Sequence, residues 1–392
     1  MKKSLIIIAI IIAGIISLNA QNDFLSYPIV DTGVSDFYDN DSIISRPGDR
    51  DPFYGQDAQY QINTPSYTDN HNGTITDNVT GLIWQKDMGE KMSFDDAFLY
   101  AEEFELAGKS DWRVPTIKEL YSLIQFTGMV EGQKAVEFYI DTEYFNQPLG
   151  DLSQGEREID AQTWSSTEYM GRTMNNDETV FGVNFVDGRI KGYPKFNMRN
   201  RSDQLMYFRL VRGNADYGKN IFTDNGDGTI TDLATGLMWQ QADNGEGLDW
   251  EDALNYAESL NMAGYDDWRL PDAKELQSII DYSRSVQTTG SAAINPIFII
   301  TEIKDPEGEL QYPYFWTSTT HLDGRNPYDS AVYLAFGEAQ GTMNGNLMDV
   351  HGAGAQRSDP KSGNTNNYPD FFGPQGDVRY VYNYIRCVRT AE

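Results

Sequence analysis

One long stretch occurs twice in the sequence, and this duplication constrains the fold more than any other feature. Residues 224–241 read DNGDGTITDLATGLMWQQ, and residues 69–86 read DNHNGTITDNVTGLIWQK, with 12 of the 18 aligned positions identical. The segments that follow the first copy recur in the same order after the second. The 392-residue chain is therefore predicted to contain two versions of one domain, each of about 150 residues.

The first 20 residues have the pattern of a secretory signal peptide. Lys2 and Lys3 precede an apolar run of 12 residues, Leu5–Ile16, and Ala20 offers a small side chain for cleavage. This run is too short for a membrane-spanning helix, and no later apolar run is long enough to cross a membrane. We therefore expect an exported protein, periplasmic, surface-located or secreted, whose mature chain begins near Gln21.

The charge of the chain restricts its partners. The sequence holds 30 Lys and Arg against 59 Asp and Glu, and its formal net charge is −29. Without Lys2 and Lys3 the formal charge becomes −31. So acidic a surface repels phosphate backbones, which excludes nucleic acid as a partner and disfavours sulfated polyanions. Cations, neutral glycans and basic protein surfaces remain, and the sequence does not indicate an oligomeric state.

The order of elements predicts an α+β fold. Each copy reads as a β-hairpin, two helices and then several strands, which predicts two tandem homologous domains with two helices packed on a mostly antiparallel sheet. We place an extended arm at 21–60, with 53–60 packed on the first domain, and the two domains at 61–213 and 214–392. The second domain is longer because of an insertion near 337–377, rich in Gly, Asn, Asp and Pro. A loop of that length is typical of a functional or disordered segment.

Two helices per domain carry clear boundary signals. Ser93 and Asp249 are predicted N-caps of the first helix in each copy, with Gly108 and Gly264 as its terminators. The second helix starts after Pro in each copy. Its capping boxes are Thr116-x-x-Glu119 and Asp272-x-x-Glu275.

With these motifs laid out, the chain resembles the Lcl C-terminal domain family of exported bacterial proteins. The residues that carry the resemblance are the DNGDGTITD–TGLMWQ stretch, the DWRLP segment at 267–271, the WTST segment at 316–319 and the closing RCVR at 386–389. The resemblance covers both domains. It implies adhesion or ligand binding outside the cell without an established catalytic activity, and a C-type-lectin-like fold.

An oxygen-rich loop in the second copy suggests a calcium site. Asp224, Asn225, Asp227 and Asp232 supply the hard oxygen ligands that calcium prefers. Their spacing does not match an EF-hand loop, and the alternative is that these side chains build and cap an Asp-Gly turn. Calcium is the one cofactor that the sequence suggests.

The tryptophans, arginines and cysteine are interpreted as structural. Six tryptophans form three pairs across the copies, which favours core positions over exposed sugar-stacking platforms. We expect Arg113 and Arg269 to pair with the capping-box residues Glu119 and Glu275. The single cysteine, Cys387, takes the position of a leucine in the first copy and is predicted to be a buried apolar residue.

No active site is evident in the sequence. The three histidines, His71, His321 and His351, lie far apart without ligand spacing, and no nucleophile or phosphate-binding motif is found. We therefore expect a non-catalytic adhesion-type protein that recognises a surface or matrix ligand such as a glycan. The alternatives are an envelope assembly module that binds proteins and a hydrolase with a carboxylate pair. The insertion supplies the candidate ligand-binding residues, which are Asn344, Asn346, Asp349, Tyr368 and Phe371.

Overall fold

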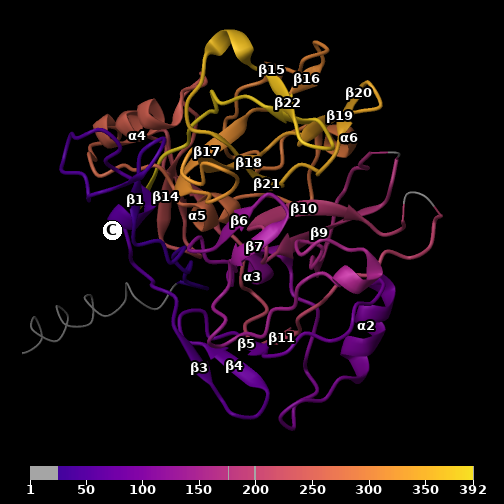
Figure 1. The fold of residues 1–392 in the computed structure, drawn as a ribbon. Helices are drawn as coiled ribbons and strands as arrows, with labels where there is room; N and C mark the ends of the chain where they lie inside the picture. The colour runs from indigo at the N-terminus through magenta and orange to yellow at the C-terminus, as the bar shows by residue number, and fades with distance from the viewer. Residues whose placement is uncertain (1–24, 175, 198–199, 392) are drawn as a thin grey trace, which may run out of the picture.

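The two sequence copies form two similar domains joined by one sheet. The computed structural model describes residues 25–174, 176–197 and 200–391, and the predicted signal peptide lies outside them. Figure 1 shows the first repeat (61–213) in the lower half and the second repeat (214–392) in the upper half. Within the described residues, no helix has the length and apolar character needed to cross a membrane. The fold is mainly antiparallel sheet with short helices, so the α+β prediction is confirmed at this level.

A six-stranded antiparallel sheet crosses both repeats. Its order is β17-β18-β21-β10-β9-β8. The strands of the first repeat are β8 (Thr163–Glu168), β9 (Thr179–Asn184) and β10 (Arg189–Pro194). Those of the second repeat are β17 (Tyr314–Thr320), β18 (Ser330–Ala335) and β21 (Gln356–Pro360).

The repeats meet where β10 pairs with β21. Ile190 lies opposite Gln356 in this antiparallel pair. β10 and β21 are each the third strand that their repeat contributes to this sheet. The strand order on one side of the pair therefore mirrors that on the other, as an internal two-fold arrangement requires. Neither repeat exposes that edge, which removes an unpaired strand that would otherwise invite aggregation.

Each repeat also holds a small four-stranded sheet built from the duplicated stretch and the last strand. In the first repeat its order is β11-β5-β4-β3 and in the second β12-β13-β14-β24. These strands are β3 (Tyr67–Asp69), β4 (Thr74–Asp77), β5 (Ile83–Gln85), β11 (Val211–Arg212), β12 (Phe222–Asp224), β13 (Thr229–Asp232), β14 (Leu237–Gln240) and β24 (Val388–Thr390).

The two helices predicted for each repeat begin where the sequence places them. They are α2 (Phe94–Glu103), α3 (Ile117–Tyr121), α4 (Trp250–Ser259) and α5 (Ala273–Ser278). The short helix α6 (Val286–Thr289) was not expected. Ser93 and Asp249 cap α2 and α4, and complete capping boxes open α3 and α5. The predicted terminators Gly108 and Gly264 are wrong. The backbone already becomes extended at Phe104 and Leu260, because their side chains pack on the neighbouring cores.

Three hydrophobic cores divide the interior. The largest lies under the six-stranded sheet and combines residues of both repeats, including Ile124 and Phe181 of the first and Leu276 and Leu334 of the second. A core beneath α2 contains Trp164, and its counterpart beneath α4 is built in the same way. The six paired tryptophans are all buried, and Cys387 is fully buried. These predictions are confirmed.

Two equivalent lysines cross the boundary between the repeats. Lys118 on α3 donates to the carbonyl of Ser278 at 2.6 Å, and Lys274 on α5 donates to the carbonyl of Ser122, the equivalent of Ser278, at 2.9 Å. Each lysine also reaches the segment before the other repeat, since Lys274 donates to the carbonyl of Asp31 and Lys118 to that of Gly218. Reciprocal bonds of this kind tie the repeats together on the side of the sheet that faces the shared core.

Residues 53–60 of the N-terminal arm pack on the second repeat, not on the first as expected, whereas Thr32 of the arm accepts a hydrogen bond from Phe126 of the first repeat. Phe53 lies against Trp250 with ring centroids 6.2 Å apart, and the Tyr60 hydroxyl donates to Glu258 at 2.7 Å. Figure 1 shows the indigo arm beside α4 in the upper half. The arm adds β1 (Phe37–Tyr38), β2 (Ile43–Ile44) and a 3₁₀ turn, η1 (Asp57–Gln59).

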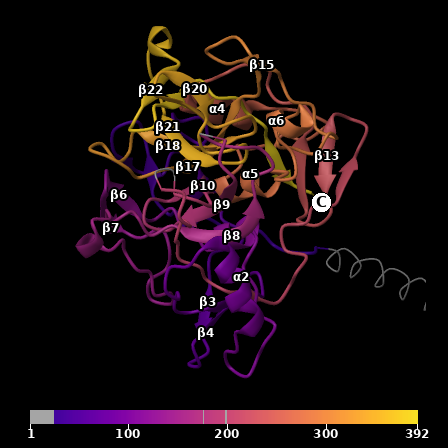
Figure 2. The same ribbon diagram turned by 90° about the vertical axis from the view of Figure 1, so that its right-hand side faces the viewer.

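The insertion of the second repeat is folded. It contains β21 and a sheet of order β20-β19-β23-β22. The strands are β19 (Gln340–Met343), β20 (Asn346–Asp349), β22 (Asp370–Phe372) and β23 (Asp377–Arg379). Two short strand pairs and two 3₁₀ turns complete the fold. The pairs are β6 (Met129–Glu131) with β7 (Lys134–Glu137) and β15 (Ile303–Lys304) with β16 (Leu310–Gln311), and the turns are η2 (Leu152–Gln154) and η3 (Thr365–Asn367). The views in Figures 1 and 2 place the insertion sheet beside the six-stranded sheet.

The predicted Arg–Glu pairs are present in both repeats and differ in burial. Arg269 binds Glu275 through two bonds of 2.6 Å, and its side chain is 7% exposed. Arg113 binds Glu119 in the same way, but its side chain is 32% exposed. The pair in the second repeat is buried because the arm covers it, with Tyr60 stacked over the guanidinium.

We expect Arg269→Met to destabilise the protein by about 3–5 kcal/mol, because Glu275 is left charged and buried. Its neighbours Asp57 and Asp272 would add repulsion. Arg113→Met is the matched control and should cost less, because Arg113 is 32% exposed and water can take its place beside Glu119, although Glu119 itself is buried. Urea unfolding of both variants checks this, and equal losses would contradict it.

Lys118 and Lys274 should contribute stability that rises with pH above about 8. Burial lowers the pKa of Lys118 and of Lys274 to about 8, while an unfolded lysine titrates near its ordinary value of 10.5. Above pH 8 these two groups have lost protons in the folded chain that the unfolded chain still binds, so their contribution to the free energy of unfolding increases with pH. Buried tyrosines such as Tyr121 and Tyr314, whose pKa is raised, act in the opposite direction as the pH nears 10, so a variant is needed to isolate the lysines. Between pH 8 and 9.5 the double variant Lys118→Met, Lys274→Met should gain less stability, or lose more, than the wild type in urea unfolding. An equal change in the two proteins would contradict this.

Candidate functional site at the junction of the two repeats

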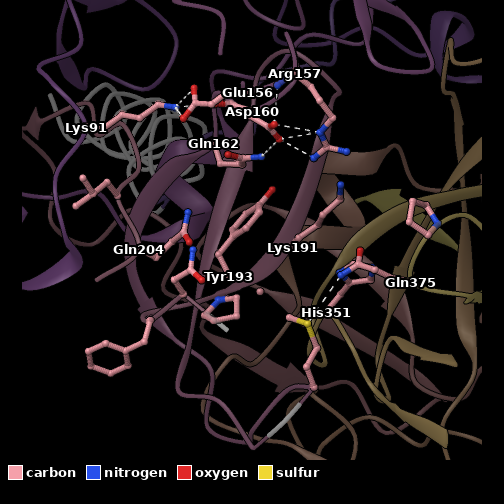
Figure 3. Close-up of a pocket in the computed structure, with 17 residues that line it drawn as sticks. Lys91, Glu156, Arg157, Asp160, Gln162, Lys191, Tyr193, Gln204, His351 and Gln375 are labelled. Atoms are coloured by element: carbon pink, nitrogen blue, oxygen red, sulfur yellow. Dashed lines mark hydrogen bonds and ion pairs between the residues drawn. The ribbon is translucent and has the colours of Figure 1, made fainter. Parts of the chain in front are cut away.

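A polar hollow lies where the two repeats meet. We call it the junction pocket, and its volume is about 710 Å³. Figure 3 shows its lining, which comes mostly from the first repeat, with the insertion of the second repeat closing one side. The lining residues are Lys91, Glu156, Arg157, Asp160, Gln162, Met174, Lys191, Gly192, Tyr193, Pro194, Phe196, Asn197, Gln204, Leu205, His351, Pro374 and Gln375.

Strand β10 provides the floor of this pocket. Its side chains alternate, so that Ile190 enters the shared core while Lys191 and Tyr193 face the pocket. Gly192 lets the chain of the second repeat approach closely, because its amide donates to the carbonyl of His351 at 2.8 Å. A Cβ at this position would lie 2.8 Å from that same oxygen. The pocket therefore depends on a glycine at the boundary of the repeats.

The charged groups at the rim are already paired with each other. Lys91 binds Glu156 at 2.6 Å, and Arg157 binds Asp160 at 2.6 Å (Figure 3). Burial acts to raise the pKa of Asp160, but the hydrogen bonds from Arg157 outweigh it and the pKa is lowered. These pairs leave donors and acceptors pointing into the pocket while the local net charge stays small.

Lys191 is the most perturbed cation of the pocket. Burial lowers its pKa to about 8, against the attraction of Asp187, whose carboxylate lies 3.0 Å away. The ammonium group is therefore charged at neutral pH and close to its titration point. In Figure 3 it lies beside the ring of Tyr193.

Tyr193 lines the pocket and carries a buried hydroxyl that makes no hydrogen bond to the described residues. Its Oη is shielded from water. Burial raises the pKa of this hydroxyl, so it remains protonated and able to donate. In the view of Figure 3 the ring lies between the Gln162 and Gln204 amides, with the hydroxyl directed to the side of Asp160 and Gln162. An orphaned buried donor of this kind has to be accounted for, and a ligand oxygen would satisfy it.

His351 forms part of the wall rather than a reactive group. Burial and the nearby Arg357 lower its pKa to about 4, so the imidazole is neutral at pH 7. Its Nε2 contacts Asp377 at 2.9 Å and Arg357 at 2.5 Å. These contacts fix the ring and connect the pocket to the insertion sheet.

The five candidate ligand-binding residues do not line this pocket, and the structure separates them. Asn344 and Asn346 are exposed at the hairpin between β19 and β20, whereas Phe371 is exposed on β22 at the opposite edge of the insertion sheet. Tyr368 precedes that edge and is partly buried. Asp349 is buried and accepts a 2.6 Å hydrogen bond from Tyr169 of the first repeat. The insertion does reach the pocket, but through His351, Pro374 and Gln375.

The candidate calcium residues serve the turn. Asp224 accepts from the Gly226 amide at 2.8 Å, and Asp227 accepts from the hydroxyl of Thr229 at 2.6 Å. Asn225 bonds to the same hydroxyl, and Asp232 is fully buried, where its carboxylate caps the next turn. Across residues 25–391, apart from 175, 198 and 199, no group of three or more His, Cys, Asp or Glu side chains could hold a metal ion. The geometry favours the turn interpretation.

The sequence carries one signal for the pocket. Residues 189–193 read RIKGY, in which polar or aromatic side chains alternate with an apolar one and a glycine. This pattern is typical of a strand with one polar face. Nothing in the sequence indicated that the insertion of the second repeat would close that face.

Comparison with known proteins decides the family. The model of the Lcl C-terminal domain matches residues 73–212 and again residues 228–351. The chain belongs to the Lcl C-terminal domain family. It carries two tandem copies, as the sequence resemblance predicted. No curated protein and no solved structure matched the chain.

In this Lcl C-terminal domain protein, Gly192→Val should loosen the boundary between the repeats. The added side chain would collide with the His351 carbonyl, and overpacking of this kind costs about 1–3 kcal/mol. Gly48→Ala is a control, because Gly48 is exposed and its Cβ would meet only the side chain of Asp51. Thermal unfolding should show a lower midpoint for Gly192→Val alone. An unchanged midpoint would show that the close approach is not needed.

Proposed function

We propose that this protein is an exported, non-catalytic binding protein of the adhesion type that holds a polar, carbohydrate-like ligand in the junction pocket. The observation that carries the proposal is the lining of the pocket. The ring of Tyr193, whose hydroxyl has no partner among the described residues, lies near the Gln162 and Gln204 amides and near two ion pairs, Lys91–Glu156 and Arg157–Asp160. Sugar hydroxyls require many donors and acceptors with an aromatic face, and this lining supplies them.

The charge balance favours a neutral glycan over a polyanion. Three cations line the pocket, Lys91, Arg157 and Lys191, and each has a carboxylate partner. The chain as a whole carries a formal charge of −29, which repels sulfated polymers at a distance. A neutral ligand meets neither obstacle.

The same pairing supports a binding role over a hydrolytic one. A glycosidase needs one carboxylic acid that remains protonated near neutral pH. Glu156 is held by Lys91, and the pKa of Asp160 is lowered by its bonds with Arg157. His351 is confined between Arg357 and Asp377. The pocket groups are therefore suited to hydrogen bonding rather than to proton transfer.

A glycan array with the mature chain, residues 21–392, tests the proposal, followed by calorimetric titration of any hit. Tyr193→Phe keeps the ring and removes the donor, so affinity should fall about three- to tenfold while stability is unchanged or slightly higher. Tyr144→Phe, at a partly buried tyrosine outside the pocket, should leave affinity unchanged.

Two outcomes would contradict the proposal. A hit that Tyr193→Phe does not affect would place glycan binding elsewhere on the protein. A blank array in both calcium and chelator would favour an envelope protein as the partner. Equal binding in the two buffers would fit the hydrogen bonding of Asp224 and Asp227 within their turn.

A further inference from the structure

The N-terminal arm shows which peptide chemistry fits one face of a repeat. On the second repeat, the Asp57 carboxylate accepts from the hydroxyl of Thr319 at 2.6 Å, and Phe53 lies on Trp250. Tyr60 contacts two further groups, because its hydroxyl donates to Glu258 and its ring covers Arg269. The contacting residues of the arm follow the spacing Phe-x3-Asp-x2-Tyr. They contact four residues of the second repeat, which are Trp250, Glu258, Arg269 and Thr319.

The first repeat carries the equivalent positions. The alignment of the copies places Phe94 at the position of Trp250, Glu102 at that of Glu258, Arg113 at that of Arg269 and Thr167 at that of Thr319. Arg113 is held by Glu119 as Arg269 is held by Glu275. The local chemistry that receives the arm is therefore present twice.

In the first repeat this face is open apart from Phe94, which is buried beneath Phe98 with the Lys195 ammonium group over its ring. Phe98 on α2 is 36% exposed, whereas its equivalent Leu254 on α4 is fully buried. Thr116 and Glu102 are exposed, whereas Asp272, the equivalent of Thr116, is buried. No described residue places an aromatic ring over Arg113 as Tyr60 does over Arg269.

Thr167 retains the donor that the arm uses in the second repeat. Thr319 accepts from the Ala273 amide and donates to Asp57. Thr167 accepts from the equivalent amide, that of Ile117, at 3.0 Å, and its hydroxyl hydrogen has no acceptor in the described part of the chain. A hollow of about 340 Å³ lies at this hydroxyl, lined by Thr116, Ile117, Lys118 and Thr167 together with the segment that links the repeats.

We propose that this face of the first repeat, formed by Phe94, Phe98, Glu102, Arg113 and Thr167, docks an extended segment of another protein with the chemistry of the arm. The segment places a carboxylate on the Thr167 hydroxyl, an aromatic ring on Phe98, which covers Phe94, and a tyrosine over Arg113 with its hydroxyl on Glu102. This site is separate from the junction pocket and does not depend on a glycan ligand.

A different protein fits this site better than the arm of a second copy. The arm of each chain is joined covalently to its own second repeat, which gives it a high effective concentration there. Its carboxylate is buried and bonded to both Thr32 and Thr319. Moving it to another molecule would break these bonds in exchange for equivalent ones, with no net gain.

A labelled peptide of residues 51–62, DPFYGQDAQYQI, tests the site when titrated into the mature chain by fluorescence anisotropy. We expect saturable binding to one site. Thr167→Val in the protein and Asp57→Asn in the peptide should each weaken binding about tenfold, since a hydrogen bond to a charged group is lost. Thr127→Val, at an exposed threonine elsewhere on the first repeat, is the matched control and should bind as the wild type does.

Glu102→Ala provides a second variant at an exposed position, in case Thr167→Val folds poorly. It should weaken the native peptide but not a peptide with Tyr60→Phe, which lacks the hydroxyl. Hydrogen exchange should show new protection over α2. No binding, or protection over α4 because the peptide displaces the arm, would overturn the proposal. Self-association of the protein that Thr167→Val abolishes would assign the face to a second copy and overturn the assignment to another protein.

Discussion

The pairing of β10 with β21 is the interaction on which the rest of this structure depends. It turns two three-stranded sheets into one sheet of six strands and lets one hydrophobic core pass beneath both repeats. On the core side, Lys118 and Lys274 secure the boundary through reciprocal bonds to main-chain carbonyls. On the opposite side, β10 forms the floor of the junction pocket, and His351 from the second repeat closes one side of it. The pocket is therefore a product of the joining of the domains and not a property of either domain alone.

The two repeats share one structural framework and differ in the segments that are added to it. The framework is symmetric, because capped helices, buried tryptophans and the Arg–Glu pairs recur at matched positions. The additions are asymmetric. The arm covers the second repeat, and the insertion extends only from the second repeat. Consequently the two repeats expose different surfaces, although their cores are built in the same way.

These two additions account for both surfaces that we propose as binding sites. The insertion closes the junction pocket by bringing His351 and Gln375 to β10. The arm covers α4 and leaves the equivalent face on α2 open. A duplicated domain can in this way acquire two different binding surfaces without a change in the shared framework, since only the segments outside the repeated core differ.

The sequence by itself determined much of the local structure. Apolar periodicity, capping residues and glycine turns act over a few residues, so the duplication predicted two α+β domains, and Ser93, Asp249 and the capping boxes lie where it placed them. The Arg–Glu pairs were also predictable, because their partners lie six residues apart beside a helix start. Only the tertiary structure decided the union of the sheets, the packing of Phe53–Tyr60 on the second repeat and the separation of the five insertion residues. Those features depend on contacts between segments as much as 262 residues apart, such as Asp57 with Thr319. No local pattern encodes such a contact, because the partner is fixed only by how the whole chain packs.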